Sequence, residues 1–258
     1  MLRRFEPLTD AAGDALCARF PGAAAAVLSA GIDAYETESV WVQAAEASAR
    51  PAAFCILQRS GTAAVYAQKD ADLAELAAFL RAGAAGTVRA GGPAFASVRG
   101  AERIFLMTQA APPTREPEGP AASVCDDFFA LHALLCRVAG LPENAAQANA
   151  WVARASRTFF AGRSCAYAAA CASGALAATA TVRFVGRYAV FEDVAALPAH
   201  RGQGLARACV EAGCRRAAKA GRLPALLCRE TAVGFWKACG FAIRETMYTG
   251  KFGNGEIF

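Results

Sequence analysis

Histidine is scarce in this chain of 258 residues, and none of its ten cysteines forms a Cys-x-x-Cys pair. Structural zinc sites usually combine cysteine and histidine at such short spacings, so the sequence predicts no metal centre. Several cysteines fall on apolar positions of expected helices or strands, where a free thiol behaves as a small hydrophobic side chain. We therefore expect reduced thiols and a cytoplasmic protein.

Targeting and membrane segments are also missing from the pattern. The first ten residues, MLRRFEPLTD, lack the apolar core of a signal peptide. Residues 164–182 carry no charge over 19 positions, which is long enough to span a bilayer. They are rich in Ala, Ser and Thr and are interrupted by Ser173-Gly174, which favours two strands joined by a tight turn. We expect no membrane association.

Basic runs of five or more residues do not occur, which argues against nucleic acid as a partner. The net charge of +5 is nevertheless uneven. Residues 1–120 carry 11 Lys+Arg and 13 Asp+Glu, a net of −2, whereas residues 121–258 carry 16 and 9, a net of +7. The positive excess of the second part would favour an anionic ligand there.

What the sequence does contain is a clear linker and two apolar parts. Residues 112–120, PPTREPEGP, hold four prolines and a glycine, a composition typical of linkers. They separate a first domain, residues 1–111, from a second, residues 121–258. In the first we expect two alanine-rich helices, a hairpin turning at Ser60-Gly61, a helix capped by Asp70, and a strand at 103–108.

The second part has a fuller pattern of alternating helices and strands. Hydrophobic spacing and turn residues predict helices over 126–139 and 143–160, strands over 164–171, 175–185 and 187–197, a helix over 202–220, a strand over 223–228, a helix over 231–238 and a strand over 241–252. The fold class is therefore α/β.

One turn in this second part has the form of a phosphate cradle. The hexapeptide Arg201–Ala206, RGQGLA, follows the strand FEDVAAL and precedes the long helix. The pattern (Arg or Gln)-x-x-Gly-x-(Gly or Ala) also occurs at 58–63 and 89–94, about as chance allows for a short motif. Only the copy at Arg201 lies between a strand and a helix, where unpaired amides attract anions and glycine lets a phosphate approach.

The strand FEDVAAL, the turn RGQGLA and the downstream run AVGFWKACGF together resemble the GNAT N-acetyltransferase superfamily, over about residues 123–252. The resemblance implies a mixed, mostly antiparallel central sheet flanked by helices. It implies acetyl-CoA as cosubstrate without a metal, and a primary amine of a small molecule or a protein as acceptor.

The same resemblance implies the residues of the acetyl-CoA site. The pyrophosphate would lie on the backbone amides of Gly202, Gln203, Gly204, Leu205 and Ala206. The pantetheine arm would pair with the strand backbone at Val194, Ala195 and Ala196. Arg201 and Arg207 are candidates for phosphate contacts, and Trp236 for the wall of the thioester pocket.

Acetyl transfer requires a neutral amine, and a carboxylate can take its proton. Glu192 is the candidate base, because strand alternation places it on the same face as Val194 and places Asp193 on the opposite face. Trp236 stands where the family commonly has a tyrosine, and an indole N–H cannot serve as the acid near neutral pH. Tyr188 and Tyr248 are possible replacements, and Arg229 stands where asparagine is frequent.

Residues 1–111 follow a similar order of elements and are predicted to be a diverged second copy that binds no CoA. Their expected role is to enclose the acceptor site or to dock the other half. Two other interpretations of the whole chain stay open: a catalytically silent acyl-CoA-binding module for sensing or assembly, and a general phosphate- or nucleotide-binding α/β protein. The acceptor and the oligomeric state are not determined by the sequence.

Overall fold

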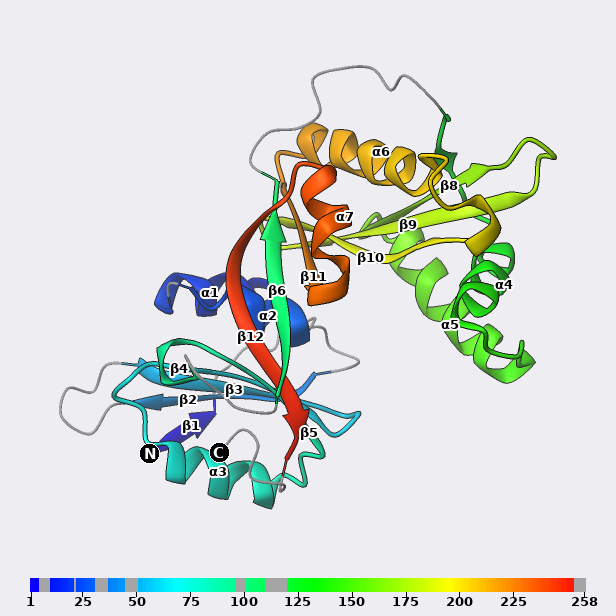
Figure 1. The fold of residues 1–258 in the computed structure, drawn as a ribbon. Helices are drawn as coiled ribbons and strands as arrows, with labels where there is room; N and C mark the ends of the chain where they lie inside the picture. The colour runs from blue at the N-terminus through cyan, green and yellow to red at the C-terminus, as the bar shows by residue number, and fades with distance from the viewer. Residues whose placement is uncertain are drawn as a thin grey trace. The chain divides into compact units, whose positions relative to one another are not determined.

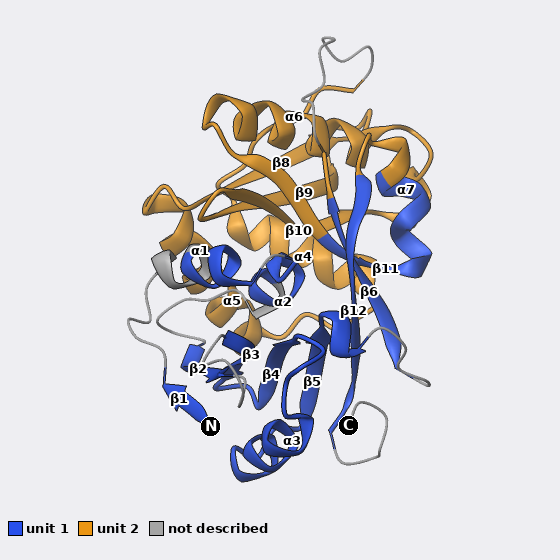
Figure 2. Cartoon of the chain, turned by 90° about the vertical axis from the view of Figure 1, so that its left-hand side faces the viewer, with its two compact units in different colours: residues 1–107, 227–236, 242–258 blue, residues 108–226, 237–241 orange. Residues whose placement is uncertain are grey.

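A computed structural model describes residues 1–4, 10–20, 22–30, 37–44, 51–95, 101–109 and 120–252 of the chain, without the side chains of 10–14, 29 and 30 (Figure 1). The chain forms two compact units (Figure 2). Unit 1 comprises residues 1–107, 227–236 and 242–258, and unit 2 comprises residues 108–226 and 237–241. The predicted linker at 112–120 lies outside the described residues except for Pro120.

Unit 1 is a mixed sheet with helices on both faces. Its elements are β1 (Leu2–Arg4), α1 (Asp10–Arg19), α2 (Ala24–Ala30), β2 (Thr37–Ala44), β3 (Pro51–Gln58), β4 (Thr62–Ala67), α3 (Leu73–Ala82), β5 (Thr87–Gly91), β6 (Glu102–Thr108) and β12 (Ala242–Lys251). The strand order is β1-β2-β3-β4-β5-β12-β6. Strands β4 and β5 pair in parallel, while β1–β2, β2–β3, β3–β4 and β5–β12 are antiparallel.

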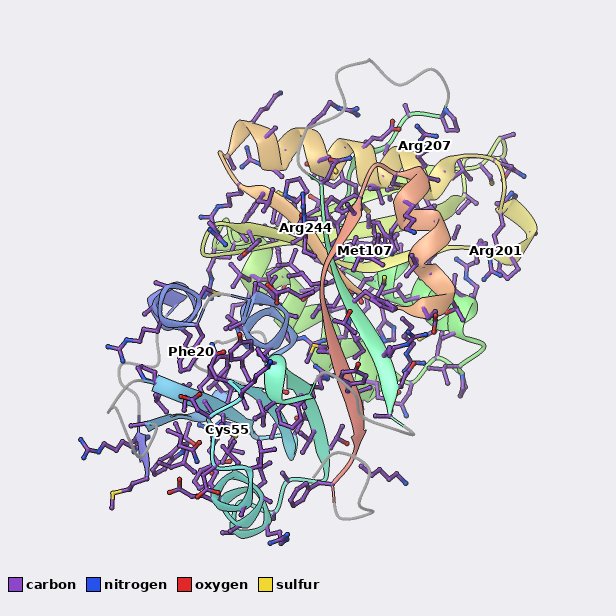
Figure 3. The ribbon with its side chains drawn as sticks, turned by 60° about the vertical axis from the view of Figure 1, so that its left-hand side comes forward. Phe20, Cys55, Met107, Arg201, Arg207 and Arg244 are labelled. Atoms are coloured by element: carbon purple, nitrogen blue, oxygen red, sulfur yellow. The ribbon has the colours of Figure 1, made fainter. Side chains whose placement is uncertain are left out.

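Two apolar cores hold unit 1 together, one on each face of its sheet. Phe20, at the end of α1, packs edge-on against Phe54 of β3 with ring centroids 5.1 Å apart. The neighbouring residue Cys55 points to the other face and packs with Leu76 and Leu80 of α3. Figure 3 shows Phe20 and Cys55 on the two sides of the strands. Alternate residues of one strand therefore supply both cores, as strand geometry requires.

Unit 2 repeats the same plan. Its elements are β7 (Ser123–Val124), α4 (Phe128–Ala139), α5 (Ala145–Phe160), β8 (Ser164–Ala170), β9 (Leu176–Val185), β10 (Tyr188–Ala196), a short 3-10 turn (Pro198–His200), α6 (Leu205–Lys219) and the first part of β11 (Leu223–Arg229); α7 (Val233–Ala238) spans the boundary between units. The strand order is β7-β8-β9-β10-β11, in which only β10–β11 is parallel. Helix α6 covers one face of this sheet, and α4 and α5 cover the other (Figure 1).

Each unit thus has two helices, three antiparallel strands, a helix and a parallel strand, in that order along the chain. This is the order of elements that a second, diverged copy of the fold in the N-terminal half would have. The mixed and mostly antiparallel sheet flanked by helices is also as expected. The division at the C-terminal end differs from the predicted boundary, because β12 pairs with β5 and therefore lies in unit 1.

The predicted elements of the second half agree with the structure to within a few residues, and residues 164–182 form the β8–β9 hairpin. In the first half, sequence reasoning missed β2 and β5. It also named Asp70 as a helix cap, whereas Asp72 accepts the Glu75 amide at 2.9 Å at the start of α3. Among the described residues, no helix has the length and apolarity needed to cross a membrane.

The cysteines behave as the composition suggested. All ten are free thiols, and six of them are buried. Burial raises the pKa of Cys209 and of Cys214, both on the sheet-facing side of α6, to about 12. These two thiols are therefore protonated at neutral pH and serve as core side chains.

Helix α6 packs very closely on its sheet because residue 213 is glycine. A Cβ atom added there would lie 2.6 Å from Cε1 of Phe191 and 2.7 Å from Cγ2 of Val182. Both distances are far below van der Waals contact, so the helix could not approach β9 and β10 this closely with any other residue.

Gly213→Ala is therefore expected to destabilise the protein by about 1–3 kcal/mol through overpacking. The matched control is Gly234→Ala in α7, where an added Cβ meets nothing within 4 Å and helix propensity alone should stabilise by up to about 1 kcal/mol. Urea unfolding of both variants measures the difference. Equal effects of the two substitutions would contradict the close packing of α6.

Candidate active site

The turn before α6 has the backbone of an anion cradle. Gly202 and Gly204 adopt left-handed φ values of +77° and +78°, which side-chain-bearing residues rarely adopt. The space beside both glycines is open: an added Cβ meets nothing within 4 Å at Gly202, and only Cδ of Pro120 at 3.9 Å at Gly204. Backbone amides at this turn can therefore be approached closely.

Helix α6 also begins without a side-chain cap. Its N-cap is Gly204, and the first bond into the helix joins the Ala208 amide to the Gly204 carbonyl at 2.9 Å. Within the described residues, no backbone hydrogen bond uses the amides of Gly202, Gln203, Gly204, Leu205, Ala206 or Arg207. Helices α3, α4 and α5 differ, since Asp72, Asp127 and Asn144 accept their first-turn amides. The structure thus gathers all five predicted pyrophosphate amides at one uncapped helix start.

The two predicted phosphate-contacting arginines lie on either side of this turn (Figure 3). Arg201 precedes it and is exposed, and no hydrogen bond or ion pair of its side chain occurs within the described residues. Arg207 lies in the first turn of α6, where its Nε donates to Oε1 of Glu211 at 2.8 Å. Arg201 is therefore the more available of the two for an anion.

Strand β10 carries an irregularity in the middle of the candidate site. Glu192 pairs with Thr181 of β9, but the next pair joins Ala195 to Thr179. Two residues of β10, Asp193 and Val194, therefore oppose one residue of β9, which is a β-bulge. Asp193 has a left-handed φ of +51°, one of only two such non-glycine residues in the described part of the chain.

The bulge corrects one prediction from the sequence. Residues that pair across two strands point to the same face of the sheet. Thr181 and Thr179, the partners of Glu192 and Ala195, lie two residues apart on β9 and therefore share a face. Glu192 and Ala195 thus lie on one face, and Val194 lies on the other. Simple alternation had put Glu192 and Val194 on the same face. The inserted residue reverses the alternation, and no sequence signal at Asp193 announces it.

The segment expected to bind the pantetheine arm has one strand edge outside the regular ladders. The parallel ladder with β11 joins Tyr188–Phe191 to Leu223–Leu226. Beyond it, Ala195 and Ala196 pair with β9 on their other edge. The β11-side edge of Val194–Ala196 is thus not used by the ladder, which fits the predicted strand-like pairing with an amide-rich ligand.

Glu192, the predicted base, is held in an ion pair. Its Oε1 accepts from both Nε and Nη2 of Arg183 on β9, at 3.0 and 2.6 Å. The two side chains are diagonal neighbours on the face opposite α6, because Phe191 and Val182 occupy the α6 face. This face is the one covered by α4 and α5. The Glu192 carboxylate is therefore held against the Arg183 guanidinium.

Asp193 is the second carboxylate at the bulge. Asp193 keeps exposed surface, but protein atoms around its carboxyl group desolvate that group. This desolvation and the charge of Glu192 raise the pKa of Asp193 from the usual 3.8 to about 6. Arg154 of α5 acts in the opposite direction.

The predicted substitutes for the family tyrosine lie elsewhere. Tyr188 is buried at the start of β10, and its hydroxyl accepts from Nη2 of Arg187 at 2.8 Å. Six residues of strand, roughly 20 Å, separate it from Val194. Tyr248 packs against the α3-side core of unit 1. Trp236 is buried in α7 beside Phe235. Arg229 is exposed and paired with Glu102. Trp236 and Arg229 belong to unit 1, so the place of Trp236 in a thioester pocket stays a prediction.

Unit 1 offers no comparable cradle where its plan would place one. Helix α3 follows β4 as α6 follows β10, but its first turn is capped by Asp72. The carboxylate of Glu75 is also there, accepting from the Leu2 amide and from Nε2 of Gln43. This helix start is therefore already occupied by two carboxylates, unlike the start of α6, and the absence of a CoA site in this half stays a prediction.

A metal centre was not expected. Within the part of the chain that the structure describes, no cluster of three or more His, Cys, Asp or Glu side chains is arranged to hold an ion.

Comparison with known proteins agrees with this geometry. Residues 130–241 match the sequence model of the Acetyltransferase (GNAT) family. No curated protein matches the sequence. Among solved structures, a GNAT-family acetyltransferase from Colwellia psychrerythraea has a TM-score of 0.61 at 14% identity, covering 98% of this chain and 99% of its own. A GCN5-related N-acetyltransferase from Sphaerobacter thermophilus has a TM-score of 0.62 at 15% identity, covering 97% and 96%.

A third solved structure bears on the two-unit architecture. It is a tandem GNAT protein from the clavulanic acid biosynthesis pathway, with a TM-score of 0.58 at 16% identity, covering 99% of each chain. The match at residues 130–241 identifies a GNAT-family domain in the C-terminal half, and these solved structures share the fold of the whole chain. The family match lies in the C-terminal half, the half that carries the uncapped turn.

The raised pKa of Asp193 makes a prediction for stability. Below pH 3.8 the Asp193 carboxyl group is protonated in both the folded and the unfolded chain. Between pH 3.8 and about 6 the unfolded chain releases this proton while the folded chain retains it, so the folded state loses stability as the pH rises. Asp193→Asn removes this loss. Its free energy of unfolding relative to the native protein should therefore grow between pH 4 and pH 7, by about 1 kcal/mol after allowance for solvent screening. Urea unfolding across this range measures it, and a difference independent of pH would contradict the shift.

Proposed function

We propose that the protein is an acetyl-CoA-dependent N-acetyltransferase that acts on a primary amine of a small molecule or a protein. The observation that carries the proposal is a run of six amides at the start of α6 that take part in no backbone hydrogen bond among the described residues, shortly after an edge-open segment of β10. A diphosphate and an amide-rich arm joined to each other, as in CoA, would use both features together.

In this proposal the pyrophosphate is bound by the amides of Gly202, Gln203, Gly204, Leu205 and Ala206. Arg201 adds a positive charge from outside the turn, and Arg207 adds a second only by giving up its bond to Glu211. The two left-handed glycines have a direct function here, because a Cβ would stand where a phosphate oxygen must approach the amides.

The backbone of Val194, Ala195 and Ala196 would bind the pantetheine amides by adding a strand to the open edge of β10. This segment begins at the bulge, so a pantetheine arm paired along it would carry the thioester end towards the bulge. Bound acetyl-CoA supplies the activated acyl group, with the thiol as leaving group. Trp236 cannot protonate the leaving thiolate, and CoA thiolate can depart without it.

The part that this chain adds to the chemistry is the removal of a proton from the attacking amine. Two carboxylates are available at the bulge: Glu192, the base predicted from the sequence, and Asp193. Either can accept a proton directly or through a water molecule. The acceptor would approach from the face covered by α4 and α5, where Glu192 lies.

A turnover assay tests the proposal. The protein is incubated with acetyl-CoA and a panel of primary amines, and release of free CoA is followed over time. Release that depends on an amine is the expected result. Binding of CoA without turnover on any amine would favour a catalytically silent acyl-CoA-binding module, and thermal stabilisation by ATP or NAD but not by CoA would indicate a nucleotide-binding protein.

The cradle itself is tested by two glycines that flank α6. Gly204→Ala is expected to weaken CoA binding at least tenfold, because a Cβ strains the left-handed backbone and obstructs the amides. Gly221→Ala is the matched control, since Gly221 is also left-handed, at +63°, and also has open space around it, but follows the helix. Isothermal titration calorimetry with CoA compares them. Equal losses of affinity would show that strain, and not the cradle, is responsible.

A further inference from the structure

Glu192, the base that the sequence suggests, is already engaged by another side chain. Its Oε1 already accepts two hydrogen bonds from the guanidinium of Arg183, at 3.0 and 2.6 Å. Charge-assisted hydrogen bonds of this kind are short and strong, so Oε1 of Glu192 is occupied by Arg183. Arg183 lies on β9, opposite Val190, so the pair is built into the sheet and does not depend on a flexible loop.

Asp193 is placed differently. No hydrogen bond or ion pair of its carboxylate occurs within the described residues, and it stands at the inserted position of the bulge with a left-handed backbone. Bulges redirect side chains next to functional sites, and strained residues of this kind persist where the surrounding structure holds them in place. Asp193 also directly precedes Val194, the first residue of the segment proposed to bind the pantetheine arm.

We propose that Asp193 is the catalytic base of the acetyl transfer, and that the Glu192–Arg183 ion pair is a positioning element that sets its charge environment. The inference rests on the proposed function. The amine nitrogen bonds to the thioester carbonyl carbon, the carbon–sulfur bond breaks, and CoA leaves as the thiolate. The amine proton passes to the Asp193 carboxylate and from there to the thiolate or to solvent, so that an amide and free CoA result.

The charged groups that act on Asp193, directly or through Glu192, come from three elements of the described chain. Glu192, its neighbour on β10, opposes ionisation, and Arg154 on α5 favours it. Arg183 on β9 acts through Glu192. The raised pKa of Asp193 makes its carboxylate a stronger base than an ordinary aspartate while leaving it ionised at neutral pH.

Two substitutions separate the roles. Asp193→Asn retains the shape and tolerates the left-handed backbone, so the bulge and CoA binding should persist while kcat falls by roughly 10²–10⁴-fold. The acid limb of the kcat/KM profile near pH 6 should disappear. Glu192→Gln should lower kcat less than tenfold and move that limb to lower pH, because a negative charge beside Asp193 is lost. Glu143→Gln, at an exposed turn before α5, is the matched control and should change neither.

A larger loss in Glu192→Gln than in Asp193→Asn, or an acid limb that persists in Asp193→Asn, would overturn the inference. A direct titration of the Asp193 carboxyl carbon by NMR in the free protein gives a readout that does not need turnover. The expected midpoint is about 6 and moves down in Glu192→Gln. A midpoint near 3.8 overturns the assignment of Asp193, whereas absence of turnover on every amine contradicts the proposed function instead.

Discussion

The close approach of α6 to the sheet of unit 2 is the constraint on which the candidate site depends. Gly213 lets the helix lie against Phe191 and Val182 without a side chain between them. Phe191 immediately precedes the two carboxylates of β10, and Gly204 begins the same helix. This single contact between α6 and the sheet therefore positions both the uncapped amides at the start of α6 and the bulge of β10.

A helix start becomes an anion site only when nothing in the protein already uses it, and the contrast among the helices of this chain shows this. Helices α3, α4 and α5 begin with Asp72, Asp127 and Asn144, each of which accepts a first-turn amide. Helix α6 begins with Gly204 and leaves its amides unused. The two units share one plan of elements, yet this exchange of a capping aspartate for a glycine distinguishes the half proposed to bind CoA from the half proposed not to.

The bulge in β10 gives two adjacent carboxylates different environments. Glu192 stays in the regular ladder and pairs with Arg183 on the neighbouring strand. Asp193 leaves the ladder, and desolvation of its carboxyl group together with the charge of Glu192 raises its pKa to about 6. Two acidic residues that are neighbours in the sequence thus acquire different surroundings from one inserted residue: one carboxylate is paired within the sheet, and the other lies at the bulge.

The sequence by itself determined the elements of the second half and the strand–turn–helix order around Arg201–Ala206, because these depend on local signals such as hydrophobic period and turn glycines. In the first half the same signals missed β2 and β5. The sequence could not determine the pairing of β12 with β5, the Arg183–Glu192 ion pair or the faces of Glu192 and Val194. Those depend on which strands meet and in what register. A one-residue insertion at Asp193 reverses every later side chain of the strand, and only the partner strand reveals it.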